Sequence, residues 1–221
     1  MLKISSALLV SLLAGSAGAQ TFLAATLTNA SENPPTVPTT FGGQPRPASL
    51  GTASFFIDSA ATFMTFTATI FNIDVNGLQT PNDVNDNLLN AHIHAGPAVT
   101  PTTNGPVVWG FFGSPLNDTN PNDVVIAPFL SGVGGTISGK WDLPEGNSTA
   151  TNPNVTLATQ LPFILNGQAY INFHTAQFGG GEIRGNIARA VPEPSALMLL
   201  AIGALGLVVV RSNSRNRAAA V

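Results

Sequence analysis

Short runs of β-branched and aromatic residues, separated by glycine, proline, asparagine and aspartate, follow one another through the middle of this chain. In the run from Phe63 to Ile73 the apolar residues recur closer to every second position than to every third or fourth. Such alternation is typical of strands. Only Val155–Leu165 predicts a short helix, which Pro153 and Pro162 limit. The runs that predict strands are Thr21–Leu27, Gly51–Ile57, Phe63–Ile73, Leu88–His94, Val107–Phe112, Gly135–Trp141, Ala169–His174 and Glu182–Ala188.

About eight short strands without a long helical pattern predict an all-β fold, an antiparallel sandwich or barrel. Its residues, 20–190, are numerous enough for one domain with a sizeable core. The chain has no cysteine, which excludes disulfides, thiolate metal sites and cysteine nucleophiles. Between Gln20 and Ala190 ten acidic and four basic residues give a net charge of −6. Because the surface has no basic stripe, nucleic acid is not expected as a partner.

The first segment, residues 1–19, has the parts of a secretion signal peptide. Lys3 supplies a positive charge, an apolar stretch follows, and Ala17 and Ala19 are the small residues before a cleavage site at Gln20. The apolar stretch is too short for a membrane anchor. We therefore expect this segment to be removed during export.

The last segment, residues 191–221, has three parts in a fixed order. Pro192, Glu193 and Pro194 form an extended stretch, because proline fixes φ and restricts the residue before it. The uncharged run 196–210 predicts a hydrophobic helix of marginal length for a permanent membrane span. Arginines then follow, and these favour the cytoplasmic side of a membrane.

This order resembles the PEP-CTERM sorting signal of Gram-negative bacteria. The resemblance implies that an exosortase-type membrane protease recognises Pro192, Glu193 and Pro194 and removes the tail. The alternative is a plain C-terminal anchor with a proline-rich stem. Either way we expect an exported bacterial protein of the cell envelope, outer surface or extracellular space, anchored at least transiently through its tail.

All three histidines of the chain lie in two of the predicted strands. Residues two apart on a strand point to the same face. His92 and His94 therefore share one face of the first strand, and Leu89, Ala91 and Ile93 take the other.

The second strand places Tyr170, Asn172 and His174 on one face, opposite Ile171 and Phe173. If the two strands are neighbours, three imidazoles converge on one polar patch. Three histidines within reach suit zinc or copper and leave a position open for water.

The same side chains also fit a structural network. His92 and His94 would then bind loop carbonyls and fix the last hairpin, while Glu182 and Arg184, which share a face, would join Asn172 in a polar network. A carboxylate near an imidazole favours its charged form, so such a patch would sense pH instead of binding metal. The spacing leaves open a structural network, a metal site and a site for another ligand.

The sequence around these histidines resembles the CHRD domain, a module named after chordin that also occurs in many bacterial secreted proteins. The resemblance spans most of the body and implies an immunoglobulin-like β-sandwich or barrel without an established enzymatic activity. Two loops rich in asparagine and aspartate, 76–87 and 117–123, look like insertions, and we interpret them as solvated turns because they lack EF-hand spacing. The segments that carry the resemblance are Glu32–Pro35, Gly51–Phe55, Ala91–Gly96, Asn104–Val108, Leu165–Thr175 and Gly181–Asn186.

A weaker resemblance is to copper/zinc superoxide dismutase, a Greek-key barrel. By that resemblance His92, His94 and His174 would stand for three of its four copper ligands, but this chain has no fourth histidine. No serine-hydrolase elbow, phosphate loop or dinucleotide fingerprint is present. We expect a non-enzymatic structural or binding module whose partner is a polymer or protein of the envelope or matrix. The alternative is a mononuclear copper or zinc protein with redox or hydrolytic activity.

Overall fold

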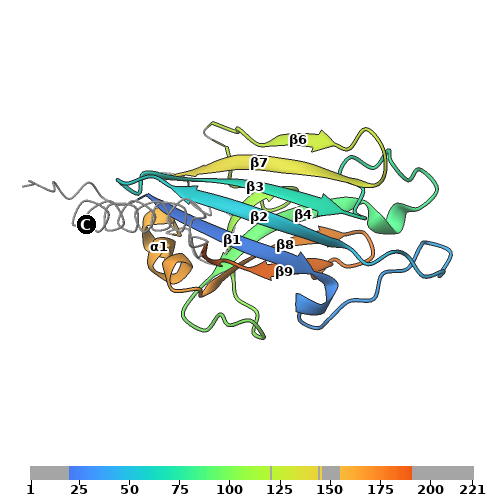
Figure 1. The fold of residues 1–221 in the computed structure, drawn as a ribbon, viewed down its shortest axis with the longest axis horizontal. Helices are drawn as coiled ribbons and strands as arrows, with labels where there is room; N and C mark the ends of the chain where they lie inside the picture. The colour runs from blue at the N-terminus through green and yellow to red at the C-terminus, as the bar shows by residue number, and fades with distance from the viewer. Residues whose placement is uncertain (1–19, 120, 144, 146–154, 191–221) are drawn as a thin grey trace, which may run out of the picture. The chain divides into compact units, whose positions relative to one another are not determined.

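The computed structural model describes residues 20–119, 121–143, 145 and 155–190 (Figure 1). The signal peptide with Ala17 and Ala19, and the tail with Pro192, Glu193, Pro194 and its expected helix, lie outside these residues. Within the described ranges, no helix has both the length and the apolar character needed to cross a membrane.

Strands dominate the described residues, and each of the eight runs predicted from the sequence contains one. The expected short helix is also confirmed as α1 (Leu157–Leu165), with Thr156 accepting a hydrogen bond from the backbone of Thr159 as its N-cap. The strands are β1 (Thr21–Thr28), β2 (Leu50–Ile57), β3 (Phe63–Phe71), β4 (Leu88–Ala95), β5 (Val107–Phe112), β6 (Val125–Pro128), β7 (Gly134–Asp142), β8 (Ala169–Thr175), β9 (Ile183–Asn186) and β10 (Ala188–Arg189).

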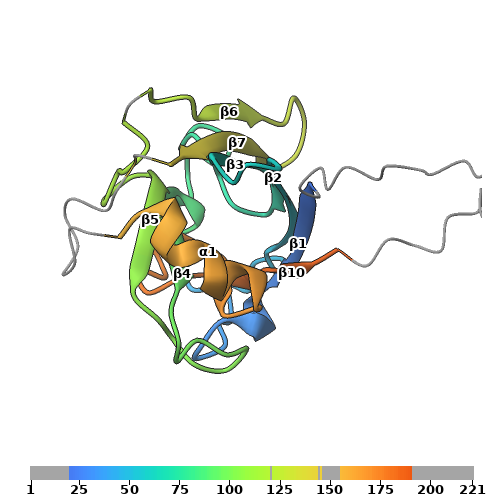
Figure 2. The same cartoon turned by 90° about the vertical axis from the view of Figure 1, so that its left-hand side faces the viewer.

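All of these strands belong to one sheet in the order β5-β4-β8-β9-β1-β2-β3-β7-β6, and β10 adds a further pairing to β1. Every pairing is antiparallel, which confirms the predicted all-β antiparallel class. The sheet curls into a half-barrel, with α1 across one end (Figure 2). The hydrogen-bonded ladder is therefore continuous through the described strands, instead of being divided between the two sheets of a sandwich.

The hydrophobic core lies against the inner face of the curled sheet. Leu27, Phe55 and Phe66 are buried on the long strands, and Trp109 of β5 stacks on Trp141 of β7 with ring centroids 5.5 Å apart. On β8 every residue is buried, so both faces of this strand are covered. One face packs into the core, and loops cover the other. This second, polar face carries the histidines.

Leu89 lies half exposed, at 50% of its full accessible area, although the sequence pattern placed it with buried Ala91 and Ile93. The ladder between β4 and β8 is irregular between Leu88 and Asn90. A bulge of this kind shifts the alternation of side chains by one residue. Leu88 is therefore buried in place of Leu89.

The two polar loops form the turns that the sequence predicts, but they are not uniformly solvated. Asp83 accepts a hydrogen bond from the backbone of Asn85, which is a typical turn contact. Asp86, in contrast, is buried and accepts a hydrogen bond of 2.7 Å from Thr80, and Asp118 is fully buried. The expectation of solvated turns is therefore wrong for these two carboxyl groups.

Candidate metal centre

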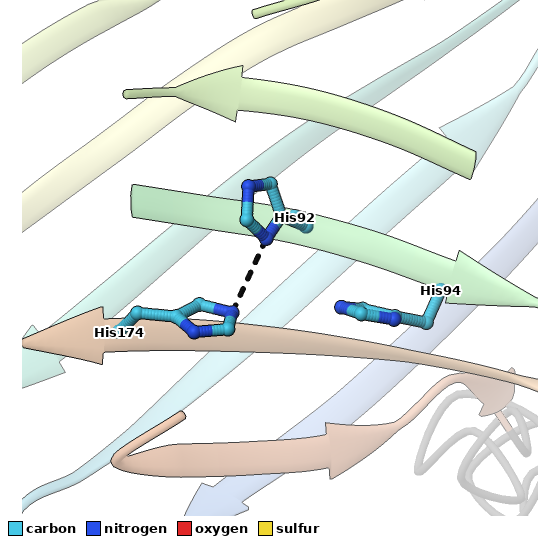
Figure 3. Close-up of side chains that lie close together, drawn as sticks. All are labelled: His92, His94 and His174. Atoms are coloured by element: carbon cyan, nitrogen blue, oxygen red, sulfur yellow. Dashed lines mark hydrogen bonds between the residues drawn. The ribbon is translucent and has the colours of Figure 1, made fainter. Parts of the chain in front are cut away.

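The structure brings the three histidines together on the polar face of two neighbouring strands. Strands β4 and β8 pair so that His92 lies opposite Asn172 and His94 lies opposite Tyr170. His174 reaches the same place from β8, and the three rings turn toward a common centre (Figure 3). One ring nitrogen of each histidine lies within 4.8 Å of those of the other two. The strand pairing thus supplies the convergence that spacing alone could not predict.

Each imidazole is held by a backbone carbonyl on the side away from this centre. His92 Nε2 lies 3.1 Å from the carbonyl oxygen of Ser114, and His94 Nδ1 lies 2.8 Å from that of Gly105. His174 Nδ1 lies 2.9 Å from the carbonyl oxygen of Gly179. A carbonyl oxygen only accepts hydrogen bonds, so these three nitrogens carry the N–H groups.

The opposite nitrogens face one another. A neutral imidazole has a single N–H, so each inner nitrogen carries a lone pair. His92 Nδ1 lies 3.2 Å from His174 Nε2, and His94 Nε2 is buried without a hydrogen-bond partner. Lone pairs at this separation repel each other unless a cation lies between them. The three inner nitrogens therefore offer a donor set of the kind that suits a metal ion.

Burial keeps these imidazoles neutral. It is the largest influence on all three rings, and it lowers the pKa of His92 to about 4, that of His94 to about 3, and that of His174 below its ordinary value. The expectation that a carboxylate would favour the charged form is wrong, because no carboxylate is among the groups that shift these pKa values. Neutral imidazole is the form that binds a metal ion.

Two members of the predicted polar network, Asn172 and Arg184, adjoin the histidines. Asn172 Oδ1 lies 3.1 Å from His174 Nε2. The Tyr170 ring stacks on His94 with centroids 4.5 Å apart, and the Arg184 guanidinium lies 3.7 Å from the centroid of the Tyr170 ring. A stack of this type holds the His94 ring in place through van der Waals and cation–π contact.

The third member, Glu182, belongs to a separate buried network. Its carboxylate pairs with Arg46 at 2.8 Å and accepts hydrogen bonds from Ser49 and Thr175. Arg184 instead donates to Asn104 Oδ1 at 2.8 Å. The predicted single network is therefore two. Arg46 and Ser49 come from the long connection between β1 and β2, where no sequence pattern marked them.

Sequence reasoning also missed the loop carbonyls and Glu32, whose carboxyl group interacts with the Asn172 side chain. A backbone carbonyl leaves no trace in residue type, which explains the first omission. Glu32, Asn104 and Gly105 did carry a signal, because they lie in the segments of the CHRD resemblance. The segments that contain these three residues are far apart in the sequence, and they adjoin Asn172, His94 and Arg184.

A comparison with protein-family models matches residues 23–187 to the model described as the CHRD domain. The chain belongs to the CHRD domain family. Its histidines and their polar neighbours all lie inside the CHRD domain. A second model, described as the PEP-CTERM protein-sorting motif, matches residues 190–215. This motif implies export and sorting to the cell surface, with processing by an exosortase. Searches of curated proteins and of solved structures found no match.

Proposed function

We propose that this CHRD-domain protein is a non-enzymatic module of the cell surface or extracellular matrix that holds one zinc or copper ion between His92, His94 and His174. The observation that carries the proposal is the orientation of the rings. Each has one nitrogen on a backbone carbonyl and the other toward the common centre. Histidines that bind metals almost always donate their second N–H to such an acceptor, which fixes the tautomer.

The ligand set favours zinc or copper. Three imidazole nitrogens suit these ions, whereas calcium and magnesium prefer oxygen ligands. Thiolates, which would favour iron–sulfur clusters or copper(I), are excluded because the chain has no cysteine.

Burial supports a non-enzymatic role. His92, His94 and His174 are 4%, 8% and 7% exposed, respectively, because loops cover the polar face of β4 and β8. A redox or hydrolytic enzyme, the competing function, requires a substrate to reach the ion. A buried ion instead joins two strands and stabilises the surface that the module offers to a polymer or protein of the envelope or matrix.

Metal analysis of the purified full-length protein tests this function. After loading with Zn²⁺ or Cu²⁺ and dialysis, we expect one ion per chain in the wild type and none in His94→Ala. Leu89→Ala is the matched control, because Leu89 lies on the same strand with its side chain half exposed. The proposal is wrong if the wild type holds no ion, or if His94→Ala holds as much as the wild type.

A further inference from the structure

A fourth hydrogen-bond acceptor lies beside the histidine cluster. Asn172 Oδ1 lies 3.1 Å from His174 Nε2, which has no proton to donate because the Nδ1–H of the same ring is bound to the carbonyl of Gly179. An amide oxygen only accepts hydrogen bonds. This contact therefore has two acceptors and no donor, as does the contact between His92 and His174.

The Asn172 amide lies beside the Glu32 carboxyl group. A Cβ placed on Gly181 would collide with Glu32 Oε2 and lie 2.9 Å from Asn172 Nδ2, so the amide nitrogen is on the Glu32 side, whereas Oδ1 lies 3.1 Å from His174 Nε2. Gly181 leaves the necessary room for this arrangement. Glu32 is itself held by the backbone N–H of Asn33 at 3.0 Å.

Two of the separations among these acceptors fit ligands of a common ion, and the ligand nitrogens of all three histidines lie within 4.8 Å of one another. Ligand atoms bound tetrahedrally at about 2.0–2.1 Å lie about 3.3 Å from one another. The distance from His174 Nε2 is 3.2 Å to His92 Nδ1 and 3.1 Å to Asn172 Oδ1. Both contacts are thus close to the edge of a tetrahedron around one metal ion.

We infer that Asn172 Oδ1 is the fourth ligand of this ion, so that the site is closed, with three histidines and one asparagine. The inference rests on the proposed metal-binding function and makes it more specific. Four protein ligands are typical of structural zinc sites, whereas catalytic sites keep a position for water or substrate. A closed site leaves no place for an external ligand on the ion.

Azide binding to the Co²⁺-loaded full-length protein tests this inference, because azide occupies an open position and changes the visible spectrum of cobalt. We expect the wild-type spectrum to stay unchanged at azide concentrations that saturate Asn172→Ala. In Asn172→Ala the three histidines retain cobalt, and the vacated position becomes available to azide. Asn172→Asp, which keeps an oxygen in place, should behave like the wild type. The control is Asn76→Ala, at an exposed loop position.

The outcomes separate this inference from the function on which it rests. If the wild type binds no cobalt, zinc or copper, the metal-binding function itself is wrong. If the wild type binds cobalt but its spectrum responds to azide as readily as that of Asn172→Ala, the function stands and the closed site is wrong. A response of Asn172→Ala to azide shows that the anion reaches the ion, and an unchanged wild-type spectrum then marks a closed site. If Asn172→Ala holds cobalt but does not respond to azide either, the inference is wrong.

Discussion

At the scale of single residues, Asp118 shows how burial of a carboxyl group affects the whole domain. The side chain is fully buried. Burial is the main cause that raises its pKa from 3.8 to about 7, and the nearby charges of Glu145 and Asp123 raise it further. The folded protein therefore holds a proton here at pH values at which the unfolded chain has released it. Such a group makes the folded state less stable as the pH rises through this range.

We predict that Asp118→Asn removes part of the pH dependence of stability. Because ionising Asp118 is unfavourable in the folded wild type, its free energy of unfolding should fall between about pH 4 and pH 7, and that of the variant should fall less. The stability gained by the variant should thus be largest above pH 7 and vanish below pH 4. Urea unfolding at a series of pH values measures this difference. Asn122→Ala, at an exposed position of the same loop, should leave the slope unchanged.

At the scale of secondary-structure elements, β9 is confined between two neighbours. It pairs with β8 on one side and approaches β1 on the other. A Cβ on Gly185 would lie 2.5 Å from the Thr26 carbonyl oxygen and 3.2 Å from the Ala25 Cβ. Only glycine therefore lets β9 lie this close to β1, and this close approach also positions Arg184.

We predict that Gly185→Ala destabilises the domain by about 1–3 kcal/mol, the usual cost of overpacking a filled interior. Gly180→Ala is the matched control, because no heavy atom lies within 4 Å of the Cβ it would add. Urea unfolding of the two variants and the wild type gives the comparison. Equal stability of the two variants would show that β9 can move away from β1 without loss.

The alternation of residues in the sequence predicts most of the strands but not all of them. The eight predicted runs contain strands because alternation in sequence follows directly from the pleat of a strand. The short strand β6 was missed. It has exposed and half-exposed residues only, and it pairs on one side with β7. An edge strand without a buried face leaves no alternation to detect.

At the scale of the whole molecule, the PEP-CTERM motif at residues 190–215 implies export, processing by an exosortase and sorting to the cell surface. We predict that the mature protein begins at Gln20 and ends near Pro194, because both ends carry recognition segments for proteases of the export route. Mass spectrometry of the protein recovered from the cell surface determines both ends. A mature chain that still extends to Val221 would mean that the tail is a lasting anchor.

The sequence by itself determined the exported class of the protein and most of the strands of its body, though not β6. It also determined that His92 and His94 share one face, and Tyr170, Asn172 and His174 another, because the period of a strand is a local property of the backbone. Only the tertiary structure decided that these faces adjoin, that loop carbonyls fix the three tautomers, and that Glu182 pairs with Arg46. It also decided that the imidazoles are neutral. These properties depend on strand pairing and burial, which arise from contacts between residues far apart in the chain.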